Sequence, residues 1–120
     1  MPGLVVTPRA GGVRGVFDQG LFAGSDHLTP TGAALLARLG RRMAGRGLSV
    51  TVTGHVVAVP GGRTSGGSVV ALARALVAAQ VLARSSAMPL TPFTLLSADQ
   101  TQGPFPDPAR NRTVTLLVVP

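Results

Sequence analysis

The stretch that decides the fold of this 120-residue chain is Leu48-Ser49-Val50-Thr51-Val52-Thr53-Gly54-His55. Apolar and polar residues alternate through its first six positions, which predicts a β-strand with one buried face. Gly54 and His55 follow at the end of that strand, and a segment rich in glycine and proline begins soon afterwards. The pattern therefore predicts a strand that delivers a glycine and a histidine to the mouth of a loop.

The residues at the N-terminus predict a β-hairpin. Leu4–Val6 and Val13–Phe17 are apolar runs, and residues 8–12 between them contain a proline and two glycines. Short apolar runs separated by a glycine turn are typical of paired antiparallel strands. Residues 18–27, which follow, are predicted to form a loop.

A helix is predicted between this loop and the strand. Thr29 can cap free backbone N–H groups, and Pro30 suits the first helical position. Gly47 is a natural left-handed terminator, whereas Gly40 in the interior costs about 1 kcal/mol relative to alanine, so we expect something to pack closely there. The apolar residues at helical spacing on one side are Leu35, Leu36, Leu39 and Met43.

Three further elements follow the strand. Val69–Arg84 predicts a second helix, and Phe93–Leu96 and Arg112–Val119 predict two strands. The order hairpin, helix, strand, helix, strand, strand predicts an α/β (α+β) two-layer sandwich with two helices on one mixed sheet. At this length we expect a single domain, 1–120, made of the N-terminal hairpin (1–20) and a core (21–120).

The charge balance is strongly basic. Eleven arginines and four aspartates give a formal net charge of +7, with no lysine and no glutamate. This sign favours polyanionic partners such as cell-wall polymers, acidic lipid or nucleic acid, although a genome rich in G and C would also enrich arginine. Nucleic acid is not expected, because the aromatic residues, 3% of the chain, are all phenylalanine and none offers the Tyr or Trp surface that stacks on bases.

The residue types disfavour most catalytic chemistry. Without cysteine there is no thiol catalysis, zinc–thiolate site or disulfide. His27 and His55 have no partner at metal-ligand spacing, and catalytic triads, paired carboxylates and phosphate-binding glycine loops are missing from the sequence. We therefore expect a protein that is not an enzyme and that uses no metal and no cofactor.

The sequence predicts neither a membrane span nor a signal peptide. The most apolar run, residues 69–83, carries Arg74 and is shorter than the roughly 20 residues that cross a bilayer. Prolines and glycines interrupt the N-terminus from Pro2 onward. Two interpretations stay open: the chain is cytoplasmic if Met1 is its native start, or it belongs to a longer anchored protein.

Several separated fragments carry a resemblance to a known family. Residues 21–32 resemble the pattern Leu-Phe-x-x-Gly-Ser followed by Leu-Thr-Pro-x-Gly. Gly54-His55 and Ala73-Arg74-Ala75 stand at matching spacing further on, and Asn111-Arg112 resembles the start of Asn-Arg-Arg-Val. On these fragments the chain resembles, over almost its whole length, the OmpA-like peptidoglycan-binding domain, and within that family the MotB-type pattern.

The resemblance implies a fold, a ligand and a location. The family's domain is a non-catalytic module of the cell envelope that grips the free amino-acid end of a diaminopimelate stem peptide. Its Gly-His-Thr-Asp aspartate faces the ligand ammonium and its helical arginine faces the carboxylate, which an arginine can hold bidentately. Carried over, the resemblance marks these residues as ligand-binding: Gly54, His55, Arg74, Asn111 and Arg112.

The sequence departs from the family pattern where the negative charge belongs. Val57 stands at the aspartate position, Ala58 follows it, Gly67 replaces an asparagine and Thr113 replaces the second arginine. Losing one charge-assisted contact costs about 1.5–3 kcal/mol and leaves the ammonium unpaired. The sequence thus predicts peptidoglycan binding that is weakened or lost. The alternative is a structural subunit of a larger assembly that keeps the fold without the ligand.

Each proposed ligand-binding side chain also has a structural interpretation. His55 could contact ligand or anchor a loop through hydrogen bonds. Arg74 could point into a polar pocket, or it could pair with a backbone carbonyl or with Asp99 or Asp107, since an unpaired buried guanidinium is costly. In the Asn111-Arg112 pair, the asparagine could satisfy loop backbone and the arginine could lie across a neighbouring helix.

Two surfaces of the predicted helices suggest partners. The second helix is apolar nearly all round, so its outer face either meets a partner or a second copy, or consists of small alanines that need no cover. The first helix carries a basic stripe without an acidic neighbour, which either meets an anionic partner or is solvated. The stripe consists of Arg38, Arg41, Arg42 and Arg46.

Overall fold

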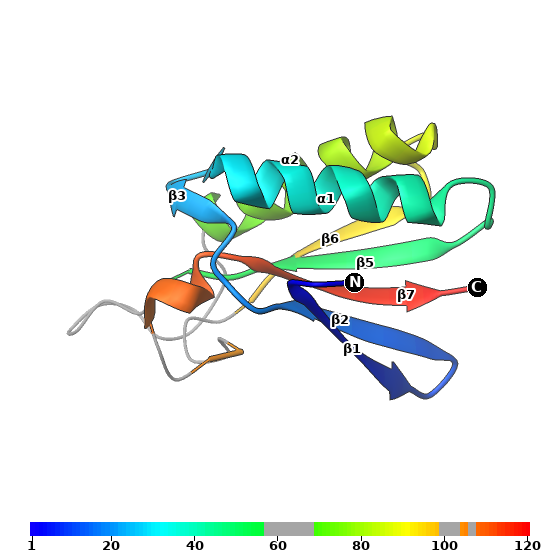
Figure 1. Cartoon of the computed structure of the whole chain (residues 1–120), viewed down its shortest axis with the longest axis horizontal. Helices are drawn as coiled ribbons and strands as arrows, with labels where there is room; N and C mark the ends of the chain where they lie inside the picture. The colour runs from blue at the N-terminus through cyan, green and yellow to red at the C-terminus, as the bar shows by residue number, and fades with distance from the viewer. Residues whose placement is uncertain (57–68, 99–103, 106–107) are drawn as a thin grey trace.

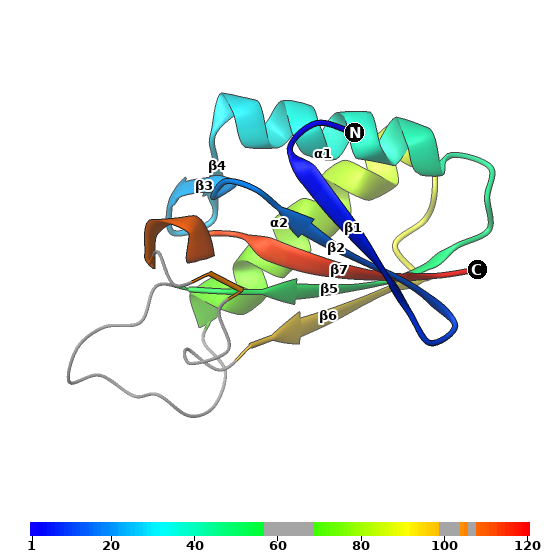
Figure 2. The same ribbon diagram turned by 60° about the horizontal axis from the view of Figure 1, so that its bottom comes forward.

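The protein is a five-stranded mixed sheet with two helices on one face and a small two-stranded sheet at one end (Figures 1 and 2). The computed structural model describes residues 1–56, 69–98, 104–105 and 108–120. The elements in chain order are β1 (Leu4–Arg9), β2 (Gly12–Phe17), β3 (Phe22–Gly24), β4 (His27–Leu28), α1 (Pro30–Met43), β5 (Ser49–Gly54), α2 (Val69–Ser86), β6 (Phe93–Ser97), the 3-10 helix η2 (Pro108–Asn111) and β7 (Val114–Val119). The predicted two-layer α+β sandwich is confirmed.

The strand with the alternating pattern, β5, lies inside the large sheet. The order is β1-β2-β7-β5-β6, and β5 pairs antiparallel with β7 and parallel with β6. Val52 of β5 stands opposite Leu116 on one side and Leu95 on the other. Val50 and Val52 are buried under the helices, as the alternating pattern predicted.

The N-terminal hairpin is longer and more tightly turned than the sequence indicated. Arg9 pairs with Gly12, so only two residues form the turn, and Pro8 lies within β1 instead of in the loop. Proline is tolerated there because β1 is an edge strand, with no described strand on its outer side. The hairpin joins the large sheet through β2, which pairs with β7.

The expected loop over residues 18–27 contains the small β3–β4 hairpin. Phe22 pairs with Leu28, and the turn lies between Gly24 and His27. Its backbone is held from elsewhere in the chain: the N–H groups of Leu21 and Phe22 both donate to the carbonyl of Arg112, at 2.9 and 3.0 Å. Such short strands leave no sequence pattern, and the carbonyl that holds the start of the hairpin lies 90 residues away in sequence.

Helix α1 begins as predicted and ends early. The Thr29 hydroxyl accepts a hydrogen bond from the N–H of Gly32 at 2.9 Å, with Pro30 in the first turn. The helix stops at Met43, and both Gly45 and Gly47 then take left-handed conformations, with φ of 75° and 64°. The expectation that the helix runs to Gly47 was therefore wrong, and Arg46 lies beyond the helix.

Helix α2 turns its alanines inward and its larger side chains outward. The buried face carries Ala71, Ala75, Ala78, Ala79, Leu82 and Ala83. Val69, Leu72 and Leu76 are exposed, so the interpretation that alanines form the outer face was wrong. Small residues face inward because α1 approaches closely: a Cβ at Gly40 would lie 2.6 Å from the Ser85 Cβ. The expected close packing at Gly40 is confirmed.

Helix α2 also extends further than predicted, to Ser86. Ala87 then takes a left-handed conformation with φ of 57°, and the N–H of Met88 donates to the carbonyl of Ala83 at 2.9 Å. The N–H of Ala87 donates to Arg84, which completes a Schellman motif with alanine where glycine is usual. This motif ends the helix before Pro89 is reached.

By length and composition, α2 is apolar enough to cross a membrane, with a mean hydropathy of 1.4 over 18 residues. The run of residues 69–83, considered from the sequence alone, was too short to cross a bilayer. Here 44% of the segment is buried against α1 and the sheet. A core helix passes the same test, so the observation is weak evidence for a membrane span.

Candidate functional site

The segments that carry the five residues marked by the resemblance come together at one end of the sheet, where β5 ends and β7 begins (Figures 1 and 2). Gly54 closes β5, Arg74 lies in the second turn of α2, and Asn111 ends η2 just before Arg112. Backbone and side-chain hydrogen bonds connect these segments to the β3–β4 hairpin. The topology therefore collects residues separated by up to 58 positions, from 54 to 112, into one neighbourhood.

Gly54 is required by the packing of β5 against α2. A Cβ built at this position would overlap the backbone carbonyl oxygen of Ala71. Backbone cannot rotate away as a side chain could, so no larger residue fits without moving the strand or the helix. The glycine brings the end of β5 against α2 one turn before Arg74.

His55 is buried and held from two sides. Its N–H donates to the Thr113 carbonyl at 3.0 Å, and its Nε2 lies 3.0 Å from the Thr115 hydroxyl. The other ring nitrogen, Nδ1, is buried and has no hydrogen-bond partner among the described residues. Burial, reinforced by the charge of Arg14, lowers the pKa of His55 from 6.5 to about 4. His55 is thus a neutral imidazole that anchors the end of β5 to β7.

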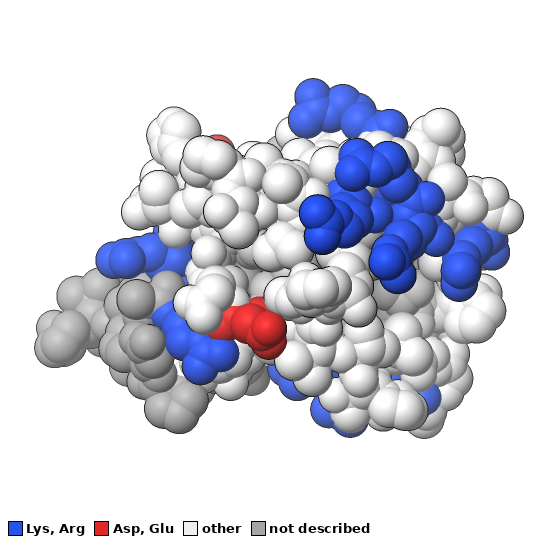
Figure 3. Space-filling model, viewed as in Figure 1, with Lys and Arg blue, Asp and Glu red and all other residues white. Residues whose placement is uncertain are grey.

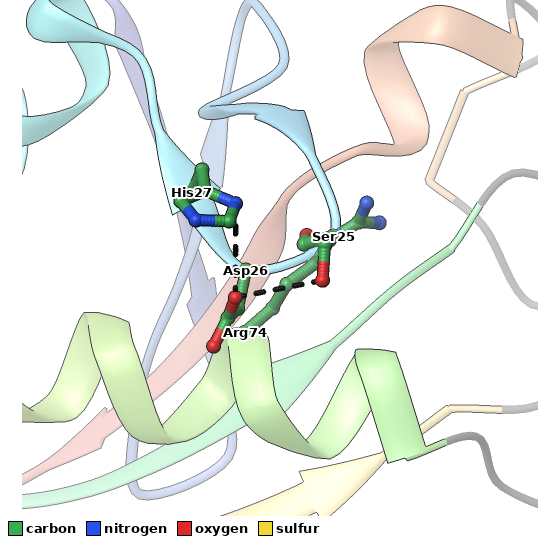
Figure 4. A network of polar contacts seen from close by, with 4 residues as sticks. All are labelled: Ser25, Asp26, His27 and Arg74. Carbon is green, nitrogen blue, oxygen red and sulfur yellow. Dashed lines mark hydrogen bonds and ion pairs between the residues drawn. The ribbon is translucent and has the colours of Figure 1, made fainter.

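Arg74 joins three segments through its guanidinium. It is only 4% exposed, and it donates from Nε to the Ser25 carbonyl at 2.5 Å and from Nη1 to the His55 carbonyl at 2.8 Å. Its guanidinium carbon also lies 5.4 Å from the centre of the Phe22 ring, within cation–π range. Figure 4 shows the side chain reaching from α2 to the turn that holds Ser25 and Asp26.

The charges around Arg74 have both signs. Burial lowers the pKa of Arg74, the positive charge of Arg112 lowers it further, and the negative charge of Asp26 raises it. Arg112 and Asp26 are therefore both close enough to act on the same guanidinium. Asp26 nevertheless forms no ion pair with Arg74 within 4 Å, since the ion pair found among the described residues joins Asp26 to His27.

Asp26 is the functional candidate that sequence reasoning missed. Its carboxylate is 42% exposed and lies 4.0 Å from His27 Nδ1, and the Ser25 hydroxyl donates to it at 3.5 Å (Figure 4). Ser25 has a positive φ of 44°, which shapes the tight turn of the β3–β4 hairpin. The signal in the sequence was an acid, one of only four, directly after Leu21-Phe22-Ala23-Gly24-Ser25.

Asn111 and Arg112 form hydrogen bonds that hold the backbone just before β7. The Asn111 amide donates to the Phe105 carbonyl at 2.9 Å and accepts from the Phe105 N–H at 3.0 Å, which matches its interpretation as a residue that satisfies loop backbone. The Arg112 carbonyl holds the start of the β3–β4 hairpin, while its side chain is half-buried. Thr113, which replaces the family's second arginine, is fully buried.

Several positions from the sequence argument lie outside the described residues. Val57, Ala58 and Gly67, which replace polar residues of the family motif, are among them. Asp99 and Asp107, considered as partners of Arg74, are others, and its partners in the described part are the carbonyls of Ser25 and His55. Across the described ranges, no cluster of three or more His, Cys, Asp or Glu residues could hold a metal ion.

The fold and the site define a small α+β domain with a charged, hydrogen-bonded corner at the end of its sheet. No family model and no curated protein matches the sequence. Solved structures do: the periplasmic domain of Helicobacter pylori MotB (residues 78–256) superposes with a TM-score of 0.74 at 16% identity, over 98% of this chain and 82% of that one. The chain folds as an OmpA/MotB-like domain.

Two other solved structures extend the likeness beyond MotB. The cell wall anchor of the T6SS from Pseudomonas aeruginosa matches with a TM-score of 0.68 at 16% identity, over 98% of this chain and 87% of the other. An outer membrane protein from Borrelia burgdorferi B31 matches at 0.66 and 12% identity, over 97% and 95%. The architecture predicted from the sequence fragments is therefore that of envelope proteins from different systems.

Proposed function

We propose that this chain is a non-catalytic cell-wall-binding domain whose charged corner takes the free amino-acid end of a peptidoglycan stem peptide, with lower affinity than an intact family site. The structural neighbours include a periplasmic domain and a cell wall anchor, which supports a place in the cell envelope. The observation that carries the proposal is the contact of Arg74 with the carbonyl of Ser25, the residue next to Asp26 (Figure 4), in a hairpin whose start is held by the Arg112 carbonyl.

A zwitterionic ligand needs one fixed charge of each sign, and this corner supplies both. Arg112 is half-buried and Asp26 is partly exposed, so each can be reached from solvent. We assign the ligand carboxylate to Arg112 and to the remaining donors of Arg74, and the ligand ammonium to Asp26. Arg74 has five N–H donors in all, of which two are used on the Ser25 and His55 carbonyls.

We expect a lower affinity than that of an intact family site because the acidic residue, Asp26, comes from a different element. Val57 removes the aspartate that the family places after Gly-His, and Asp26 reaches the corner from a different element, the β3–β4 turn. Its carboxylate is also shared with Ser25 and His27, and these partners compete with a ligand ammonium. A charge-assisted contact of this kind is worth about 1.5–3 kcal/mol when desolvated and less at an exposed carboxylate.

Sedimentation with purified diaminopimelate-containing peptidoglycan tests the proposal. Asp26→Asn and Arg112→Gln each remove one pole, and we expect each to weaken binding about tenfold. Arg84→Gln is the matched control, since it removes one charge from the exposed surface of α2 far from the corner. Equal losses in Arg112→Gln and Arg84→Gln, together with unchanged or tighter binding of Asp26→Asn, would reduce the binding to net charge and refute the site.

A gain-of-function variant tests the same site from the opposite direction. Val57→Asp restores the acid of the family motif, and we expect it to strengthen wall binding because it supplies a second partner for the ligand ammonium. Val57→Asn, which adds a polar group without the charge, is the control. Unchanged affinity in Val57→Asp would argue against this corner as the binding site.

A second candidate function rests on the outward face of α2. Val69 is 87% exposed, and Leu72 and Leu76 are 45% and 39% exposed along the same line of the helix. Apolar residues grouped in this way mark interaction surfaces, so the chain could serve as a structural subunit that docks through α2. Sedimentation velocity of the chain and of Leu72→Ser/Leu76→Ser measures this directly. A concentration-independent monomer would remove self-docking from consideration.

A further inference from the structure

A cleft opens at the opposite end of α1 from the charged corner. It lies between the C-terminal half of α1 and the sheet next to the N-terminal hairpin, and it has a volume of about 240 Å³. Its walls are mostly aliphatic, and Val6 and Val13 in the hairpin are exposed on its side. The residues that give the cleft its apolar character are Leu4, Val6, Val13, Leu39, Leu48 and Val118.

Two arginines stand at this aliphatic cleft, and neither is paired with an aspartate that the structure describes. Arg42 and Arg46 both line it and are both exposed. Of the aspartates that the structure describes, Asp18 follows β2 near Arg110, and Asp26 lies in the β3–β4 turn. Figure 3 shows the arginines gathered over this end of α1, with the acidic patch of that face well apart from them.

The helix dipole accounts for only part of this arrangement. Arg41 and Arg42 in the last turn complement the negative end of α1. Arg46, however, lies beyond the helix, and a dipole gives no reason for the aliphatic cleft next to it. Gly15 helps to keep the cleft open, since a Cβ there would lie 3.3 Å from the Leu4 side chain.

We propose that this cleft binds a single anionic amphiphile, with an aliphatic chain along the leucines and valines and a phosphate or carboxylate head on Arg42 and Arg46. Charge complementarity sets the sign of the head, because two exposed guanidinium groups stand at the cleft and no described acid does. With about 30 Å³ for each water-sized group, the cleft of about 240 Å³ has room for a short aliphatic chain of roughly eight carbons. The hollow shape favours a single amphiphile molecule over a membrane, since binding to a bilayer surface requires apolar groups that protrude.

Calorimetric titration with octyl phosphate below its micelle concentration tests this site. The wild-type protein should bind octyl phosphate at least about tenfold more tightly than inorganic phosphate, because the octyl group buries apolar surface in the cleft. Octanol and octyltrimethylammonium should bind far more weakly, since they lack the negative head. Octyl phosphate binding no tighter than inorganic phosphate would overturn the aliphatic part of the proposal.

Variants of equal charge separate the site from the general basicity of the chain. Arg42→Gln/Arg46→Gln should weaken octyl phosphate binding about tenfold or more, whereas Arg38→Gln/Arg84→Gln should change it less than about threefold. Val13→Phe and, independently, Val6→Phe fill the cleft and should also weaken binding, with folding checked by circular dichroism. Equal losses in both arginine pairs, or full binding in both filled variants, would overturn the proposal.

Discussion

The buried imidazole of His55 makes the stability of this domain depend on pH. Its Nε2 is paired with Thr115, and its Nδ1 has no acceptor among the described residues for the proton that would arrive on charging. The folded state therefore holds the pKa of His55 at about 4, while the unfolded chain takes up the proton near the ordinary value of 6.5. Between these values the unfolded state binds more protons than the folded state does.

The sign and size of the effect follow from this difference. Stability rises with pH wherever the unfolded state carries the extra proton, so the contribution is complete above about pH 7 and is lost as pH falls toward 4. For a pKa of 6.5 unfolded and about 4 folded, the loss is about 2 kcal/mol at pH 5 relative to pH 8. That is a substantial part of the 5–15 kcal/mol typical of a small domain.

Urea unfolding followed by far-ultraviolet circular dichroism at pH 5, 6, 7 and 8 measures the effect. His55→Gln retains an amide nitrogen at the Nε2 position but cannot titrate, so the difference between wild type and variant isolates this one group. We expect wild type to lose about 2 kcal/mol more than the variant between pH 8 and pH 5. His27→Gln, which alters an exposed histidine, should behave like wild type. Parallel curves for wild type and His55→Gln would refute the reasoning.

Three further predictions concern backbone geometry. Gly54→Ala places a Cβ on the Ala71 carbonyl and should cost about 3 kcal/mol or abolish folding, whereas Gly24→Ala, which has open space, should be nearly neutral by the same urea assay. Gly40→Ala gains about 1 kcal/mol of helix propensity but meets Ser85 and should still lose about 1 kcal/mol net; a stabilised variant would show that α1 and α2 can separate freely. Ala87→Gly relieves a left-handed alanine and should raise the thermal midpoint, by about 0.5–1 kcal/mol of stability; an unchanged midpoint would contradict the strain assigned there.

The sequence by itself determined the layers of this protein. Period-two alternation in β5 and the Thr29-Pro30 helix start are local signals, because the side chains that produce them are neighbours in the chain. The close packing at Gly40 was also readable, since a glycine inside a helix costs stability unless something requires it. Together with the separated motifs, these signals were enough to indicate the OmpA/MotB-like architecture.

The C-terminal ends of the two helices were harder to predict from the sequence. Helix α1 ends at Met43 and not at the predicted terminator Gly47, and α2 ends at Ser86, just before the left-handed Ala87. Both ends depend on which carbonyl groups are satisfied by later N–H groups, and several nearby positions were acceptable in the sequence. The inward placement of alanine on α2 was hidden for a related reason. Alanine and leucine are both apolar, and only the short distance to α1 decides which of them fits inside.

Only the tertiary structure decided the charges and contacts of the candidate site. Arg74 was recognisable in the sequence, but its use of the Ser25 and His55 carbonyls depends on the β3–β4 hairpin, which the distant Arg112 carbonyl holds. Asp26 lies 48 positions from Arg74 in sequence and becomes its electrostatic neighbour only when that hairpin folds back over α2. Local patterns specify helices and strands because their causes are short-range, whereas a charge pair across elements exists only once the chain has been folded.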